Sequence, residues 1–267
     1  AATIIAPSYS MLGQPDYAFQ FTLSTPQGDY PLPVVPSSER LADPSDKQIS
    51  TAIDCFHTLK KIGPSRLIVT CHSPLAPERY LLAVSVRPTE LAPPLGDCFA
   101  EVRTKLPPSH SQMLENPRIS AGICSPVSTA MVLGLHKPAV SVGSIISACY
   151  DPVTRMYGMW PLAIRSASSV DCLGAVELFR NWEPVNACLE RGVPVVASIR
   201  YRKGELPGAP LAATGGHLVV VHGLHDHRVL VNDPAAPNHG SVGRNYPVDA
   251  FAAAWFQHRG AAYVLAP

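Results

Sequence analysis

Hydrophobic and polar positions alternate along the first hundred residues in short runs. Residues 17–23 carry an aromatic side chain or a leucine at every second position, which is typical of a half-buried strand. Residues 66–70 and 80–86 are further β-rich runs bounded by Pro and Gly, whereas residues 49–62 fit either a helix or a strand. The pattern predicts a small β-sandwich in this part of the chain.

The spacing of apolar residues changes after about residue 105. Helices are predicted at residues 124–135, 140–150, 173–182, 183–192 and 247–260. Strands are predicted at residues 193–201, 217–222, 228–233 and 262–265. Because helices come early and strands late, the order is that of an α+β domain. The Pro- and Gly-rich stretch 88–108 is typical of a linker, so we predict a β-rich domain at residues 1–105 and a second domain at residues 106–267.

Composition narrows the classes of partner. The net charge is +1 and no basic run is interleaved with aromatic residues, which argues against a nucleic-acid partner. No apolar run reaches the roughly 18 residues of a membrane span. The 7 cysteines include no CxxC pair, so we predict no zinc site, no other metal and no cofactor. Unpaired cysteines favour the cytoplasm, although a trimmed export signal stays open, and the oligomeric state is not indicated.

One cysteine stands at a chemically distinctive position. Cys124 comes directly before an apolar stretch with helical spacing, where Ser125 is the predicted N-cap and Pro126 suits the first helical turn. A thiol at a helix N-terminus lies at the positive end of the helix dipole, which favours the thiolate. The alternative is a buried structural cysteine.

A histidine and an acid follow on two predicted strands. If residues 217–222 and 228–233 form a hairpin closed by a loop at residues 223–227, His217 faces Asp233 with Cβ atoms roughly 4.5–5.5 Å apart. The carboxylate would then orient the imidazole, a role for which Asn232 is a rival. The alternatives are a structural histidine and a turn-forming Asp-Pro. Together, Cys124, His217 and Asp233 can supply a nucleophile, a base and an orienting acceptor.

These segments carry a resemblance. Cys-Ser-Pro-Val-Ser-Thr-Ala-Met-Val-Leu from Cys124, Gly-Gly-His-Leu-Val-Val-Val around His217 and Val-Asn-Asp-Pro-Ala around Asp233 resemble the bacterial C39-like peptidase family, over roughly residues 109–267. The resemblance implies a papain-like fold, Cys124 as nucleophile, His217 as general base and acid, and Asp233 as orienter. It also implies an oxyanion-hole glutamine, here Gln112, acting with the backbone N–H of Cys124. Gln112 lies farther upstream than papain-type spacing, and Arg118 occupies the closer position.

The resemblance predicts a cysteine peptidase that acts on a peptide or other amide through a thioester acyl-enzyme. Two other functions stay open: acyl transfer to an amine or thiol by the same cysteine, and a non-catalytic papain-fold binding module. A third alternative is a metal site, because His222, His225, Asp226 and His227 crowd one predicted turn near His239. Their spacing lacks a ligand pattern, so we favour the hydrolase.

Overall fold

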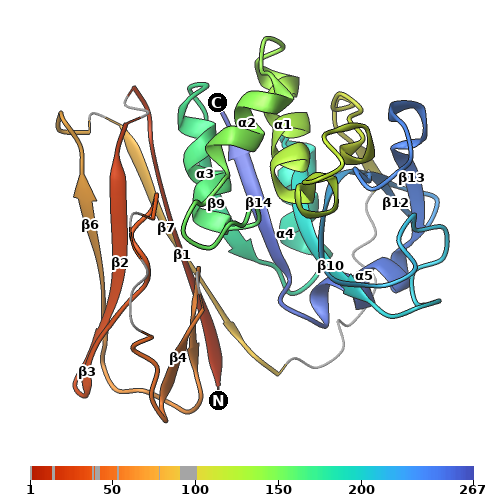
Figure 1. The fold of residues 1–267 in the computed structure, drawn as a ribbon. Coiled ribbons are helices and arrows are strands. Elements are labelled where there is room, and N and C mark those ends of the chain that lie inside the picture. Colours follow the sequence, from red (N-terminus) through yellow and green to blue (C-terminus); the bar gives the residue numbers. More distant parts are fainter. Residues whose placement is uncertain are drawn as a thin grey trace.

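A computed structural model describes residues 2–13, 16–37, 39, 43–52, 54–77, 79–90 and 101–267. The N-terminal strands are β1 (Thr3–Met11), β2 (Ala18–Thr25), β3 (Gly28–Pro31), β4 (Ile49–Thr51), β5 (Phe56–Thr58), β6 (Arg66–His72) and β7 (Tyr80–Pro88). They lie at the left of Figure 1 in two antiparallel sheets, with strand orders β4-β5-β1-β7 and β3-β2-β6. Residues 49–62 therefore include two short strands rather than a helix.

One apolar core lies between these two sheets. Phe19 and Phe21 of β2 are buried, as the alternation in the sequence predicts, and they share a core with Tyr9 and Met11 of β1. The intervening side chains of β2 are only partly buried. This difference follows from the strand geometry, in which successive side chains point to opposite faces of the sheet.

The rest of the chain builds a larger sheet with helices on both faces. Its strands are β8 (Val102–Arg103), β9 (Leu173–Leu178), β10 (Val195–Tyr201), β11 (Thr214–His225), β12 (Arg228–Asn232), β13 (Gly243–Pro247) and β14 (Ala261–Ala266). The helices are α1 (Cys124–His136), α2 (Val142–Ala148), α3 (Trp160–Ser168), α4 (Trp182–Glu190) and α5 (Val248–Phe256), with short 3-10 turns η1 (Gln112–Leu114), η2 (Ser120–Gly122) and η3 (His239–Ser241). The strand order is β13-β12-β11-β10-β14-β9, and β8 pairs with the end of β11.

Strand β11 is buried on both faces and packs against helices on each of them. Leu218 and Val220 belong to the core under α1, α2 and α3. Val219 and Val221 belong to the core under α4 and α5, on the opposite face. Because side chains alternate along a strand, one apolar run supplies both cores. The chain is thus a mixed α/β protein, and none of the helices among its described residues is long and apolar enough to cross a membrane.

The predicted helix over residues 173–182 is wrong. Residues 173–178 form strand β9, and α4 begins only at Trp182, where the Asn181 side chain caps it by accepting from the N–H of Glu183. The sequence patterns also missed α3 and β13. Strand β9 lies at the edge of the large sheet and packs against β1 and β7, so long-range contacts override its helical spacing.

The hairpin of β11 and β12 is closed by a tighter turn than predicted. Asp226 and His227 both have positive φ, 47° and 53°, and they join the strands as a two-residue turn instead of a five-residue loop. A bulge at His222 then shifts the pairing, so that Val221 lies opposite Val231.

The predicted pairing of His217 directly opposite Asp233 is therefore wrong by two residues. Pairing runs to Val220 opposite Asn232, and its continuation places Asp233 beside Val219. A shift by two residues preserves the face to which a side chain points, because the period of a strand is two. His217 and Asp233 consequently remain on one face of the sheet.

The N-terminal strands contact the edge of the large sheet through hydroxyl groups. The backbone N–H groups of Gly174, Val176 and Leu178 in β9 donate to Ser10, Ser8 and Ser85 at 3.0, 3.0 and 2.9 Å. These bonds satisfy an edge that would otherwise expose unpaired donors. The division near residue 105 stays a prediction; β8, just before it, pairs with β11 of the large sheet.

Candidate active site

Helix α1 places Cys124 at its first residue. The hydroxyl of Ser128, one turn on, donates to the carbonyl of Leu218 at 2.9 Å and holds the helix against β11. Ser125 is not the N-cap that the sequence predicts, because its hydroxyl is bonded to the hydroxyl of Tyr263 at 2.9 Å and the residue before the helix makes no side-chain cap. As a whole residue, Cys124 is partly exposed at the start of a buried helix.

The side chain of His217 lies close enough to the thiol of Cys124 for each group to shift the pKa of the other. Burial raises the pKa of this thiol, but the hydrogen bond and charge of His217 and the backbone N–H groups of Leu218 and Ser125 outweigh burial. The pKa of Cys124 therefore lies below that of an ordinary cysteine. A thiolate beside an imidazole is the arrangement that makes cysteine nucleophilic near neutral pH.

His217 is bonded in turn to Asp233. Its Nε2 lies 2.7 Å from Oδ1 of Asp233, and both side chains are almost fully buried. Burial alone would lower the pKa of His217, but the charge and hydrogen bond of Asp233 and the Cys124 thiol raise it above its ordinary value. Burial likewise raises the pKa of Asp233, but His217 and further donors lower it below the usual range. The pair thus favours an imidazolium beside a carboxylate.

Tyr246 is a site residue that sequence reasoning missed. Its hydroxyl donates to Oδ2 of Asp233 at 2.8 Å, while the N–H of Ala235 donates to Oδ1 at 3.0 Å. The only signal in the sequence is a tyrosine before Pro247, in a strand that the pattern did not reveal. Asn232, the rival orienter, instead donates to the carbonyl of Pro107 at 3.1 Å.

Gln112 lies against the turn before Cys124. Its Nε2 donates to the carbonyl of Ser120 at 2.6 Å, and its backbone N–H donates to the carbonyl of Pro234 at 2.8 Å. The amide is almost fully buried, and its Oε1 has no hydrogen-bond partner among the described residues. Arg118, at the closer papain-type spacing, is exposed. The structure therefore brings Gln112, and not Arg118, between η2 and the loop that follows Asp233.

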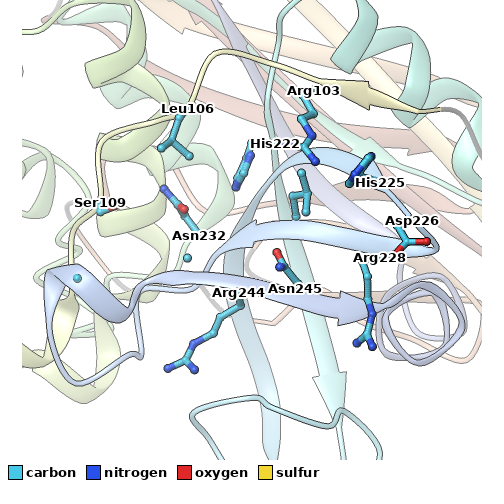
Figure 2. A pocket seen from close by; sticks show the side chains of 13 residues that line it. Arg103, Leu106, Ser109, His222, His225, Asp226, Arg228, Asn232, Arg244 and Asn245 are labelled. Atoms are coloured by element: carbon cyan, nitrogen blue, oxygen red, sulfur yellow. The ribbon is translucent and has the colours of Figure 1, made fainter.

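His222 and His225 near the end of β11, with Asp226 of the turn, line a separate cavity of about 480 Å³. Figure 2 shows His222, His225 and Asp226 around it, together with Arg103 from β8. His225 is bonded to Glu101, and burial lowers the pKa of His222 to about 4. In the described parts of the chain, no three His, Cys, Asp or Glu side chains come together as metal ligands would.

The sequence profile of the Peptidase_C39 like family matches residues 107–263. The chain belongs to this family. The matched segment of this Peptidase_C39 like chain contains all the candidate-site residues described above, Gln112, Cys124, His217, Asp233 and Tyr246, and strands β1–β7 lie outside it. The comparison with curated proteins gave no match.

Three solved structures are similar to part of this chain. A putative C39-like peptidase from Bacillus anthracis is 18% identical, with a TM-score of 0.48 and coverage of 63% of this chain and 98% of that one. A double glycine motif protease from an AMS/PCAT transporter, solved with a leader peptide, is 15% identical, with a TM-score of 0.42 and coverage of 63% and 96%. The peptidase domain of Streptococcus ComA, a bifunctional ABC transporter, is 13% identical, with a TM-score of 0.38 and coverage of 62% and 98%.

Proposed function

We propose that the chain is a cysteine peptidase or amide hydrolase in which Cys124, His217 and Asp233 act together. The observation that carries this proposal is a buried imidazole bonded to a buried carboxylate at 2.7 Å, with the thiol of Cys124 close enough to that imidazole for its pKa to be lowered. Nucleophilic attack on a carbonyl by a thiol needs these groups in this order. The match to the Peptidase_C39 like family supports a peptide as the substrate.

In the proposed reaction the Cys124 thiolate attacks the carbonyl carbon of the scissile bond, and a C–S bond forms. The His217 imidazolium gives its proton to the leaving nitrogen, the C–N bond breaks, and a thioester remains. Water then attacks the thioester while His217 takes a proton from it, and the C–S bond breaks to release the acid and restore the thiolate. Asp233 holds the imidazole in position and stabilises its charged form.

Two donors are available for the oxyanion in this mechanism. The N–H of Cys124 begins α1, and the first N–H groups of a helix have no acceptor within the helix. Gln112 uses one hydrogen of Nε2 for Ser120, which leaves the second hydrogen for the substrate oxygen. Both donors are fixed before the substrate arrives, as electrostatic stabilisation of a transition state requires.

The same proposal includes the fold of each part of the chain and the path of the substrate. A thiol on a helix and an imidazole and carboxylate on an antiparallel sheet support a papain-like arrangement for residues 106–267. The two N-terminal sheets share one core, which supports a β-sandwich for residues 1–105. At the start of β11, Gly215 and Gly216 are exposed and a Cβ built on either would meet nothing within 4 Å. An extended peptide can approach this backbone closely.

Alkylation by iodoacetamide below pH 8 tests the proposal. Cys124 should react much faster than Cys188, a half-buried cysteine, because the pKa of Cys124 is lowered and burial raises that of Cys188, so that Cys124 has the larger fraction of thiolate. His217→Ala removes the interactions that lower the pKa of Cys124 and leaves the burial that raises it, so labelling should slow and require higher pH. Similar rates for Cys124 and Cys188 would contradict the assignment of Cys124 as nucleophile.

Cleavage of a peptide library, read by mass spectrometry, tests the reaction itself. The wild-type chain should produce new termini that carry a free carboxylate, and Cys124→Ala should produce none. A library left intact by a protein whose Cys124 alkylates rapidly would indicate a reactive thiol that does not hydrolyse these peptides.

A further inference from the structure

A groove of about 1010 Å³ lies where the ends of β10 and α5 meet the start of β11. One wall carries Arg200, Arg202 and Lys203, from the end of β10 and the loop after it. The opposite wall is the last part of α5, which presents small side chains such as Ala253 and Ala254. The small residues of the helix leave room for an extended chain, and along α5 the lining has no large apolar side chain to anchor one.

The groove concentrates positive charge. Three cationic side chains line it, whereas Glu205 is the single carboxylate among its lining residues. The pKa of His258, also in the lining, is lowered first by burial and then by the charges of Arg200 and Arg202, against an opposing effect of Glu205, so both guanidinium groups lie near this imidazole. No salt bridge joins the lining cations to any carboxylate of the described residues. The whole chain carries a net charge of only +1, so this excess is local.

The groove extends to the start of β11, the strand that carries His217. Gly215 lines it and precedes His217 by two residues in β11, a distance of about 7 Å along an extended strand. Tyr201 lines it too, and the pKa of Tyr201 is raised to about 12 by burial and by the charge of Asp233. The lining of the groove therefore reaches the surroundings of the proposed orienting carboxylate.

We propose that this groove binds the segment of a peptide substrate adjacent to the scissile bond and that Arg200, Arg202 and Lys203 select acidic side chains in that segment. This inference rests on the proposed peptidase function and names its substrate class. At roughly 3.3 Å per residue, an extended substrate places the groove about two to four residues from the bond that is cut. The exposed glycine backbone allows close approach, so charge rather than apolar burial provides the selectivity.

The expected effect follows from the exposure of these cations. An exposed ion pair contributes about 0.2–1 kcal/mol, and 1.4 kcal/mol corresponds to a factor of ten. With one such pair for each cation, neutralising all three should lower kcat/KM for an acidic substrate by about 3- to 140-fold. The effect should shrink at high salt, since the charges are solvent-exposed and screened.

Cleavage assays with matched peptides test the selectivity. A peptide cut by the wild-type chain is resynthesised with Glu or with Gln at positions two to four residues from the scissile bond, on either side. The Glu peptide should be preferred by the wild type, and R200Q/R202Q/K203Q should lose the preference. A control, K60Q/K61Q/R66Q, makes the same change of net charge on exposed residues of the N-terminal part and should keep it. Equal cleavage of the Glu and Gln peptides by the wild type would overturn the proposal. So would a preference for the Glu peptide that remains in R200Q/R202Q/K203Q.

A binding assay separates this inference from the proposed chemistry. Cys124→Ala protein is titrated into a fluorescein-labelled octapeptide with two glutamates, or into its twin with two glutamines, and anisotropy is measured. Tighter binding of the glutamate peptide that depends on the groove cations supports the proposed selectivity for acidic side chains. If the wild type nevertheless cuts no peptide, only the proposed peptidase function is contradicted. Indifference to charge overturns the groove even if cleavage is efficient.

Discussion

Removal of the Tyr246 hydroxyl tests how much its hydrogen bond stabilises the buried carboxylate of Asp233. Asp233 is fully buried and accepts bonds from His217 at 2.7 Å, Ala235 at 3.0 Å and Tyr246 at 2.8 Å. Tyr246→Phe keeps the aromatic ring, which stacks on Phe251, and deletes only the donor to Oδ2. That oxygen then remains buried with no donor from the tyrosine, which costs stability.

The magnitude depends on the charge of Asp233. A hydrogen bond to an ionised group contributes roughly 1.5–3 kcal/mol, against about 0.5–1.5 kcal/mol between neutral groups. The pKa of Asp233 is lowered in the folded state, so its contribution is present above the ordinary carboxyl pKa and is lost as pH falls through the folded value. Tyr246→Phe should therefore lower the free energy of unfolding by about 1.5–3 kcal/mol at pH 7 and by less in acid.

Urea unfolding followed by circular dichroism at a series of pH values from neutral to acid measures this difference. Tyr263→Phe is the matched control, because the Tyr263 hydroxyl is equally buried but bonds the neutral hydroxyl of Ser125 at 2.9 Å. The control should lose about 0.5–1.5 kcal/mol at every pH. If Tyr246→Phe loses the same amount as the control and shows no dependence on pH, Tyr246 does not stabilise an ionised Asp233.

Two further variants test the oxyanion donor and the packing behind the site. Gln112→Ala should lower kcat about 100- to 1,000-fold while leaving the alkylation rate of the thiol unchanged, because the amide would act only on the transition state; slower alkylation would indicate a structural role. Gly260→Ala should destabilise the fold by about 3 kcal/mol or more in urea, since Gly260 has a φ of 60° and a Cβ there would lie 2.1 Å from Arg87. Gly243→Ala, with nothing within 4 Å of its Cβ, should stay within about 0.5 kcal/mol, and equal losses would refute the reasoning.

The bond between His217 and Asp233 was predictable from the sequence even though the register was not. The hairpin argument used only the face of each strand, and the two-residue shift preserves that face. The turn itself was missed because Asp226 and His227 adopt positive φ without the Gly or Asn that usually marks such turns.

Other parts of the site carry no signal in the sequence. Gln112 is held by the carbonyls of Ser120 and Pro234, and any residue type supplies a carbonyl. The family resemblance therefore suggested the glutamine as a candidate, but the sequence did not reveal the turn that fixes it. Tyr246 lies on an edge strand too short for the alternation of apolar and polar residues to identify.

The N-terminal sheets and the segment that matches the family, residues 107–263, form hydrogen bonds with one another's buried polar groups. The composition of the predicted linker gives no sign of these contacts. Arg87 of β7 is fully buried, with no described carboxylate within salt-bridge distance, and burial lowers its pKa to about 10. Its guanidinium donates instead to the carbonyls of Phe179, at 2.8 Å, and Phe256. A buried charge without such acceptors is costly, so β7 depends on these carbonyls.

Phe256 is the last residue of α5, and Gln257 and His258, which follow it, line the basic groove. Arg87 therefore fixes one end of the helix that forms a wall of this groove, at the same contact where the serines of β1 and β7 cover the edge of β9. A variant that loosens this contact should change the groove as well as stability. For this reason we assign the N-terminal sheets a part in holding the proposed substrate site, and not only in covering the sheet behind it.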